Sequence, residues 1–331
     1  MNKLIIGLFK KIIMLSVFCT LMLFSLCSCG KKTANKDSIK IVCSTFPQYD
    51  WVRNLTKDVD NIDLHLLVKN GIDIHNYQPT AEDIMTISDC DIFIYVGGLS
   101  DKWLDDVLKQ TTNKDMILVD MMDIVKANLK EEEIVEGMEA EEEEEDEEEG
   151  VEYDEHIWLS LTNAKMICTE IETALEKTDS PNSAKYKTNL DEYIACLDEL
   201  DGEYKSVVAA AKKDTILFGD RFPFRYLVDD YQIKYYAAFV GCSAESEASF
   251  ETIKFLADKL NELKLPAVIS LDGSKQDLAN TVIENSGMKD VEVITMDSMQ
   301  TINKEDIDNG KTYIDSMKTN LNALKIALEA K

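Results

Sequence analysis

The chain has 331 residues, of which 63 are acidic and 35 are basic, so its formal net charge is −28. This acidic excess argues against binding to nucleic acid or anionic lipid through the protein's own field, and it favours attraction of cations. Five cysteines follow residue 29, an odd number without a CxxC pair, which argues against a disulfide framework and a zinc-finger pattern. Cys43, Cys90 and Cys168 lie in apolar stretches and are expected to be buried free thiols.

The N-terminus has the pattern of a bacterial lipoprotein signal. Three lysines precede an apolar run over residues 12–27, which is shorter than the roughly 20 residues of a membrane-spanning helix. The sequence LCSC ends at Cys29 and resembles a lipobox, so we expect residues 1–28 to be cleaved and Cys29 to be acylated, for example with palmitate. Acyl chains would then anchor the protein to the lipid bilayer at the extracytoplasmic face of the cell membrane, with residues 29–37 as a tether. An ordinary signal anchor is the alternative.

Short β-rich runs alternate with helical patterns in two blocks. We expect strands at 39–43, 62–68, 91–96 and 116–119, and then at 215–218, 235–239, 267–271 and 291–296. Expected helices include 81–87, 101–109, 162–175, 250–263 and 275–285. This alternation predicts an α/β protein with two lobes, each built on a mostly parallel four-stranded sheet. We place the N-terminal lobe at 38–182 and the C-terminal lobe at 214–331.

One long helix is expected to join the two lobes. Apolar residues from Tyr186 to Ala211 recur at alternating spacings of four and three, which marks one face of a helix. A rigid linking helix over residues 183–213 would be roughly 40 Å long. A coiled-coil dimer seam is the alternative, but two flanking α/β blocks favour a strut within a monomer.

An acidic insertion interrupts the N-terminal lobe at residues 131–155. It includes nine consecutive acids at 141–149, whose mutual repulsion predicts disorder. The run is interpreted either as a solvated spacer or as a site of weak cation capture.

The chain has only three histidines. His65 lies inside an expected strand and is interpreted as structural. His75 follows the second strand and His156 directly precedes a helix, while Asp220 and Asp272 lie at the ends of two strands of the second block. Ligands of open α/β sheets bind outside the carboxyl ends of the strands. Imidazole together with carboxylate suits zinc, manganese or iron.

Three motifs carry a resemblance to a known family. They are GIDIHNYQPT at residues 71–80, GGLSDKW at 97–103 and DEHIWLS at 154–160. Over about residues 39–328 the chain resembles the zinc/manganese solute-binding proteins of bacterial metal ABC transporters, the ZnuA/TroA-like family. The resemblance implies two α/β lobes joined by a long helix, with the metal between the lobes and with His75 and His156 as ligands.

The second block departs from the family pattern. The third ligand is usually His or Glu five residues before a Tyr, but in GDRFPFRY at 219–226 that spacing falls on Arg221. A guanidinium cannot bind a cation, so a one-residue shift to Asp220 is the alternative. Asp272 lies in the segment where the family places its fourth, acidic ligand. Two histidines and two carboxylates fit Zn²⁺, with Mn²⁺ as the alternative.

These observations predict a transport protein and not an enzyme. The expected function is capture of a divalent transition metal, zinc in the first place, and its delivery to the permease and ATPase of an ABC importer. Alternatives within transport are a manganese, iron, metal-chelate or haem binder. Alternatives of other classes are a surface adhesin and a metallohydrolase, although no HExxH, GxSxG, P-loop or GxGxxG pattern occurs.

Overall fold

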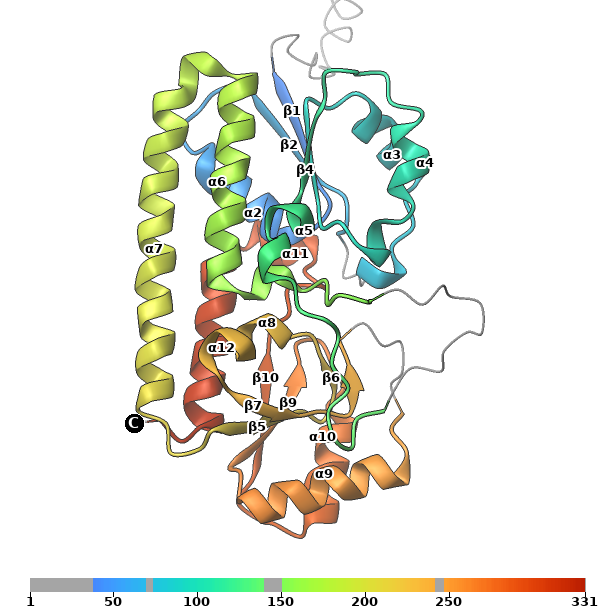
Figure 1. The fold of residues 1–331 in the computed structure, drawn as a ribbon, viewed down its shortest axis with the longest axis vertical. Coiled ribbons are helices and arrows are strands. Elements are labelled where there is room, and N and C mark those ends of the chain that lie inside the picture. The colour runs from blue at the N-terminus through green and yellow to red at the C-terminus, as the bar shows by residue number, and fades with distance from the viewer. Residues whose placement is uncertain (1–37, 70–73, 140–150, 242–246, 331) are drawn as a thin grey trace, which may run out of the picture. The chain divides into compact units, whose positions relative to one another are not determined.

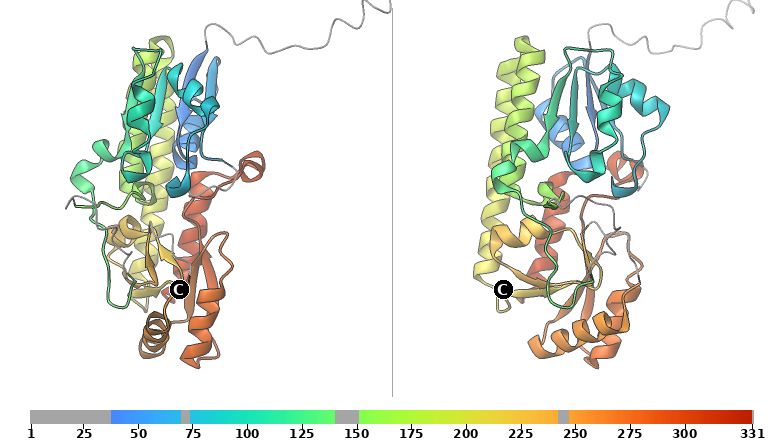
Figure 2. Two further views of the ribbon diagram at one scale, coloured as in Figure 1. Left: turned by 90° about the vertical axis from the view of Figure 1, so that its right-hand side faces the viewer. Right: turned by 45° about the vertical axis from the view of Figure 1, so that its right-hand side comes forward.

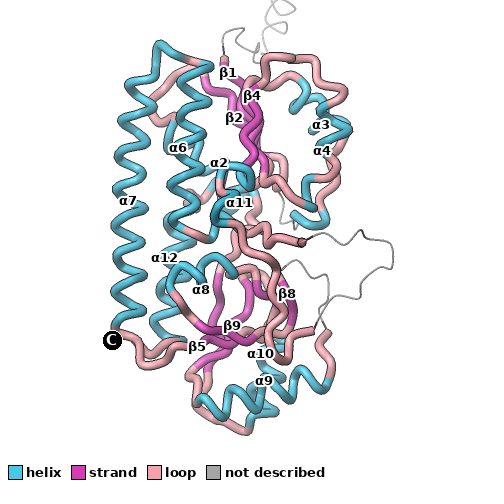
Figure 3. Tube along the Cα trace, viewed as in Figure 1, coloured by secondary structure: helices cyan, strands magenta, loops and turns pink. Residues whose placement is uncertain are grey.

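The computed structural model describes residues 38–69, 74–139, 151–241 and 247–330. The expected signal segment, the acylated Cys29 and the tether therefore lie outside the described residues. Ile39 to Lys331 belong to one compact unit. Within it, strands gather in two groups, with helices around and between them (Figure 3). The parts of the chain around these two groups are called the N-terminal and C-terminal lobes. The boundaries 38–182 and 214–331 stay a proposal.

The N-terminal lobe is built on a parallel sheet with the strand order β2-β1-β3-β4. Its strands, each within two residues of the predicted bounds, are β1 (Ile39–Cys43), β2 (Ile62–Leu66), β3 (Ile92–Tyr95) and β4 (Ile117–Asp120). Helices on one side are α2 (Phe46–Leu55), α6 (Leu161–Thr178) and α7 (Ser183–Ala209), and on the other side α3 (Ala81–Ser88) and α4 (Leu104–Leu108) (Figure 1). The short helix α5 (Met121–Ile124) follows β4. The carboxyl ends of the four parallel strands thus open toward the C-terminal lobe.

The sheet of the C-terminal lobe is less regular than predicted. Two parallel ladders, β5–β7 and β9–β10, are joined by a bridge between Phe218 and Ile269. Expected strand 235–239 is two strands, because the chain leaves the ladder after Tyr236 and pairs with β6 from Phe239 onward. The strands are β5 (Thr215–Leu217), β6 (Arg221–Phe222), β7 (Lys234–Tyr236), β8 (Phe239–Val240), β9 (Ala267–Leu271) and β10 (Glu292–Met296). The helices in this part of the chain are α8 (Arg225–Tyr231), α9 (Phe250–Leu263), α10 (Asp277–Ser286), α11 (Lys304–Asp308) and α12 (Tyr313–Ala327).

The predicted linking helix is present as α7, which has 27 residues. Its buried side chains include Tyr186, Tyr193, Leu200 and Val207, so the expected stripe is the face that packs inward. α7 contacts α2 and α6 of the N-terminal lobe, and α8 and α12 of the C-terminal lobe (Figure 2). Because α12 also contacts α2, the lobes are joined by more than one helix.

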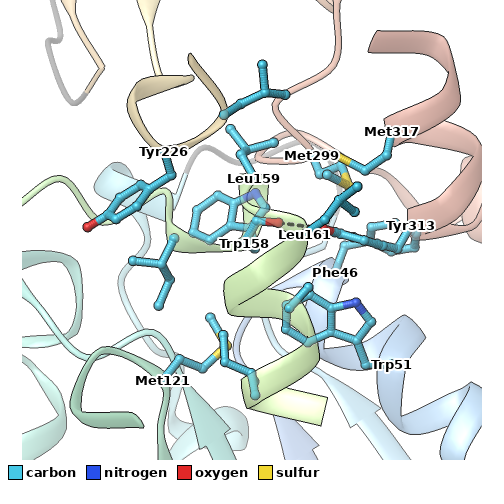
Figure 4. Close-up of a cluster of buried hydrophobic side chains, with 14 of the residues drawn as sticks. Phe46, Trp51, Met121, Trp158, Leu159, Leu161, Tyr226, Met299, Tyr313 and Met317 are labelled. Carbon is cyan, nitrogen blue, oxygen red and sulfur yellow. Dashed lines mark hydrogen bonds between the residues drawn. The ribbon is translucent and has the colours of Figure 1, made fainter. Parts of the chain in front are cut away.

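A buried cluster at the junction ties the lobes together (Figure 4). The Trp158 indole Nε1 donates to the Ser298 carbonyl oxygen at 2.9 Å, and the Tyr313 hydroxyl donates to the Trp158 carbonyl oxygen at 2.6 Å. The Tyr313 ring also packs edge-on against Trp51, with ring centroids 5.2 Å apart. Burial of a large side chain contributes roughly 1.5–3 kcal/mol. The Trp of the DEHIWLS motif therefore has a structural role, and its ring packs edge-on against His156 with centroids 5.3 Å apart.

Residues 130–139, which hold the first part of the acidic insertion, follow a defined path along the C-terminal lobe (Figure 1). The Glu139 amide donates to the Ala238 carbonyl oxygen at 2.9 Å, and Met138 is only 8% exposed. The predicted disorder does not hold for these residues, because their backbone and apolar side chains find partners on the C-terminal lobe. The nine consecutive acids lie within 140–150, outside the described residues.

Candidate metal site

His75 is placed by a short 3-10 turn, Ile74–Asn76, that follows β2. The turn is fixed by Ile74, which is buried, and the imidazole is fixed by Ser100, whose Oγ is 2.8 Å from His75 Nδ1. Ser100 lies in the 3-10 turn Leu99–Asp101 of the GGLSDKW motif. A metal ligand of this kind binds through one ring nitrogen while the other is held by a hydrogen bond. Because Ser100 contacts Nδ1, Nε2 is the ring nitrogen of His75 that would bind an ion.

The two glycines of GGLSDKW allow this turn to form. Gly97 has φ +85°, and a Cβ there would lie 2.1 Å from Asp120 Oδ1. A Cβ on Gly98 would lie 2.3 Å from Oε1 of Glu155, and that same oxygen accepts a hydrogen bond from the Ser100 amide at 3.0 Å. Gly97 thus lets the chain lie close to Asp120 and Gly98 lets it lie close to Glu155, and in this turn Ser100 contacts His75.

His156 comes from the DEHIWLS motif and is completely buried. Oδ1 of Asp154 accepts a hydrogen bond from the His156 amide at 2.8 Å and is 3.0 Å from His156 Nδ1. An ionised carboxylate can only accept, so we assign the ring proton to Nδ1. Nε2 of His156 then carries a lone pair. Carboxylate and histidine are arranged here as in many metal sites, where the carboxylate orients the ligand.

The two imidazoles face each other through their Nε2 atoms, which are 3.4 Å apart. The ring centroids are 5.4 Å apart and the planes are inclined by 62°. Zinc–imidazole bonds of about 2.0–2.1 Å at a tetrahedral angle place two nitrogens about 3.3–3.4 Å apart. The spacing in the protein equals that value, and it is longer than a usual hydrogen bond of about 2.7–3.2 Å. The spacing of the His75 and His156 Nε2 atoms is thus compatible with two ligands of one tetrahedral ion.

Acidic side chains surround the histidine pair. Burial of the His156 ring lowers its pKa, but Asp154 and Glu155 raise it more strongly, and the net pKa is raised. Burial also raises the pKa of Asp101 to about 6, with a further contribution from Glu155. The concentration of carboxylates next to two imidazoles favours a cation at this place.

The two predicted carboxylate ligands, Asp220 and Asp272, line a cavity of about 820 Å³ together with Asn76 and Ser298 among others. Both oxygens of Asp220 accept backbone hydrogen bonds, from the Arg221 amide at 2.9 Å and from the Leu271 amide at 3.1 Å. Among the described residues, no three His, Cys, Asp or Glu side chains are grouped to hold an ion. The structure thus brings the two histidines together and leaves both carboxylates apart from them.

His65 lies on β2 and its Nε2 is 3.1 Å from Asp63 Oδ1, with both side chains about half exposed. Cys43, Cys90 and Cys168 are buried free thiols, which confirms that prediction. Ser100 and Asp154 lie within two of the three motifs but are not among the predicted site residues. A carboxylate two residues before a predicted His ligand was the signal that could have identified Asp154.

Comparison with known proteins places the chain in a family. The family described as "Zinc-uptake complex component A periplasmic" matches residues 41–327. The chain belongs to this family. It is 29% identical over 305 residues to the high-affinity zinc uptake system protein ZnuA of Bacillus subtilis, with 91% of each chain covered. It is 28% identical over 319 residues to the zinc-binding lipoprotein AdcA of Streptococcus pneumoniae, where it covers 96% of its own length but 60% of AdcA.

Solved structures agree with this membership of the zinc-uptake component A family. The crystal structure of the metal-dependent lipoprotein YcdH from Bacillus subtilis has 26% identity and a TM-score of 0.70, and it covers 88% of this chain and 100% of that one. The expected α/β fold with parallel sheets and a long helix is thereby confirmed. Within the described ranges, no helix combines the length and the apolar character needed to cross a bilayer.

Proposed function

We propose that this protein captures a zinc ion outside the cytoplasm and delivers it to the permease and ATPase of an ABC importer. The observation that carries the proposal is the 3.4 Å separation of the His75 and His156 Nε2 atoms, each with its other ring nitrogen held by a neighbour. The named zinc-binding relatives support zinc as the ion. The net charge of −28 favours encounter with cations.

The remaining ligands are proposed to come from the lining of the cavity, to which Asn76, the neighbour of His75, contributes together with Asp220 and Asp272. Asp272 is the stronger candidate, because its side chain is about half exposed and lines the cavity. Asp220 would lose its hydrogen bonds from the Arg221 and Leu271 amides if it turned toward an ion, so water is an alternative to it. Manganese remains the alternative cargo, since histidine and carboxylate ligands suit it as well.

The proposed function includes attachment of the protein to the membrane. An acylated Cys29 would hold a monomeric protein beside the permease, with the lobes free of the bilayer. The role is one of binding and release without turnover. Adjacent genes for a metal permease and an ATPase would support this assignment.

Thermal unfolding with and without zinc tests the proposal. An ion that binds only the folded state adds about 4 kcal/mol of stability at a thousandfold its Kd, so zinc should raise the melting temperature more clearly than magnesium does. His75→Ala and His156→Ala should each remove most of that rise. His65→Ala is the matched control, because its imidazole is half exposed on β2, and it should leave the rise intact. A full rise in both site variants would show that the ion binds elsewhere.

A further inference from the structure

Lys311 lies between two carboxylates beside the cavity. Its Nζ is 2.7 Å from Asp297 Oδ2 and 3.9 Å from Asp272 Oδ2. Asp297 is nearly buried and also accepts hydrogen bonds from the Met299 amide and the Ser316 hydroxyl, each at 2.8 Å. Asp297 is therefore the fixed partner that holds the ammonium, while Asp272 is the more exposed carboxylate within reach of its charge.

The backbone around Lys311 keeps it in this position. Gly310, with φ +87°, ends the turn after α11, and the Lys311 amide donates to the Asp306 carbonyl oxygen at 3.0 Å. Only 25% of the Lys311 side chain is exposed. Asp297 and the turn together place one positive charge next to the carboxylate that faces the cavity.

We propose that Lys311 lowers the affinity of the metal site for its ion by repelling a divalent cation from Asp272. This inference rests on the proposed function and adds a residue that determines affinity. Lys311 is not a ligand, because an ammonium group has no lone pair to donate. Its charge neutralises part of the Asp272 charge before the ion arrives, and it opposes the ion afterwards. The effect weakens capture and favours release to the permease, which a transport protein needs as much as binding.

The repulsion depends on charge and distance, so it acts alike on zinc and manganese at the same place. Removal of the charge should therefore tighten both ions by a similar factor. A change in packing would alter the affinities of the two ions unequally, or lower the stability of the metal-free protein without tightening either ion.

The test compares Lys311→Gln with wild type in the full-length protein, purified in detergent. Glutamine removes the charge but can still donate a hydrogen bond to Asp297. Competition with a chromophoric chelator should show Kd values for zinc and manganese that are each roughly tenfold lower, as expected for one charge near a divalent ion in a partly solvated cleft. Lys304→Gln is the matched control, since Lys304 is exposed and pairs with Asp308 on α11, and it should leave both Kd values unchanged.

A double variant separates the proposed cause from others. In Asp272→Asn the carboxylate no longer draws the ion toward Lys311, so addition of Lys311→Gln should change the zinc Kd less than it does in wild type. Unchanged zinc and manganese Kd values in Lys311→Gln, with tight zinc binding by wild type, would overturn this inference and leave the proposed function standing. Absence of zinc binding by wild type would instead contradict the proposed function. Lys311→Met, which also removes the charge, carries the same expectation and decides the question if the glutamine variant is unstable.

Discussion

Substitution of Asp154 gives a quantitative test of how the site is organised. Oδ1 of Asp154 accepts from the His156 amide and contacts His156 Nδ1, at 2.8 and 3.0 Å. Asn can keep the backbone hydrogen bond through its own Oδ1 but removes the charge that orients and strengthens the ligand, whereas Ala removes everything. Loss of such a partner costs about 10–100-fold in metal affinity, or about 1.4–2.7 kcal/mol. We expect Asp154→Asn near the lower end of this range and Asp154→Ala near the upper end.

The assay is equilibrium competition for zinc with a fluorescent chelator at neutral pH. Asp63→Asn is the matched control, because it removes a carboxylate charge beside His65, a half-exposed histidine on β2 that is not a predicted ligand. The control should bind zinc like wild type. Asp154→Ala should also lower the free energy of unfolding by about 1–3 kcal/mol, since it leaves buried donors of His156 unpaired. Wild-type zinc affinity in both Asp154 variants would refute the assignment of His156 as an oriented ligand.

Three further predictions concern pH, the segment on the C-terminal lobe and the acidic run. Burial lowers the pKa of His156, but Asp154 raises it and the net pKa is raised. Calorimetry should therefore show that zinc affinity falls as the pH drops below that raised pKa, because the protonated imidazole cannot bind the ion. In the metal-free protein the stability from this pair is present below about pH 6.5 and is lost as the pH rises through the raised pKa. Gly137→Ala should lower the free energy of unfolding in urea by more than about 1 kcal/mol, because φ at Gly137 is +81° and a Cβ would lie 2.0 Å from Phe255 Cδ1. Gly310→Ala is the control with the smaller loss, because φ there is +87° but a Cβ would point into open space, so only the backbone strain destabilises it. Deletion of the nine consecutive acids should leave the zinc Kd nearly unchanged but reduce weak cation binding in equilibrium dialysis; undiminished weak binding would make the run a spacer.

Much of the fold follows from local sequence patterns. The bounds of β9 (Ala267–Leu271) and α9 (Phe250–Leu263) agree with the prediction residue for residue, because an apolar run broken only by Ser270 marks the strand and a clear helical period marks the helix. The break between β7 and β8 was not foreseen. Tyr235 to Phe239 reads as one apolar strand, and only the pairing of Phe239 with Arg221 of β6 shows where the chain changes partner.

The acidic insertion shows the same limit. Charge density predicts disorder over 131–155, yet Val135 and Met138 interrupt the acids and pack against the core. Glu133 adds an ion pair with Arg225 at 3.5 Å. Two apolar side chains in an acidic segment were the available signal, but their partners lie about a hundred residues away in the chain.

Some features of the candidate site could be predicted from the sequence and others could not. His75 and His156 could be predicted because short motifs surround them and because histidine is rare in this chain. The charges around Asp272 could not be predicted, since Lys311 and Asp297 are distant from it in the sequence and lie near it only in the fold. One of the two backbone hydrogen bonds to Asp220, from the Leu271 amide, likewise depends on the approach of β9.

X-ray absorption at the zinc edge, on protein loaded with one equivalent of zinc, tests the central claim most directly. We predict a shell of nitrogen and oxygen at about 2.0–2.1 Å with the outer-shell scattering of two imidazoles, and no sulfur at about 2.3 Å. His75→Ala and His156→Ala should each remove one imidazole from that signal. A sulfur shell, or a spectrum without imidazole scattering, would contradict the account.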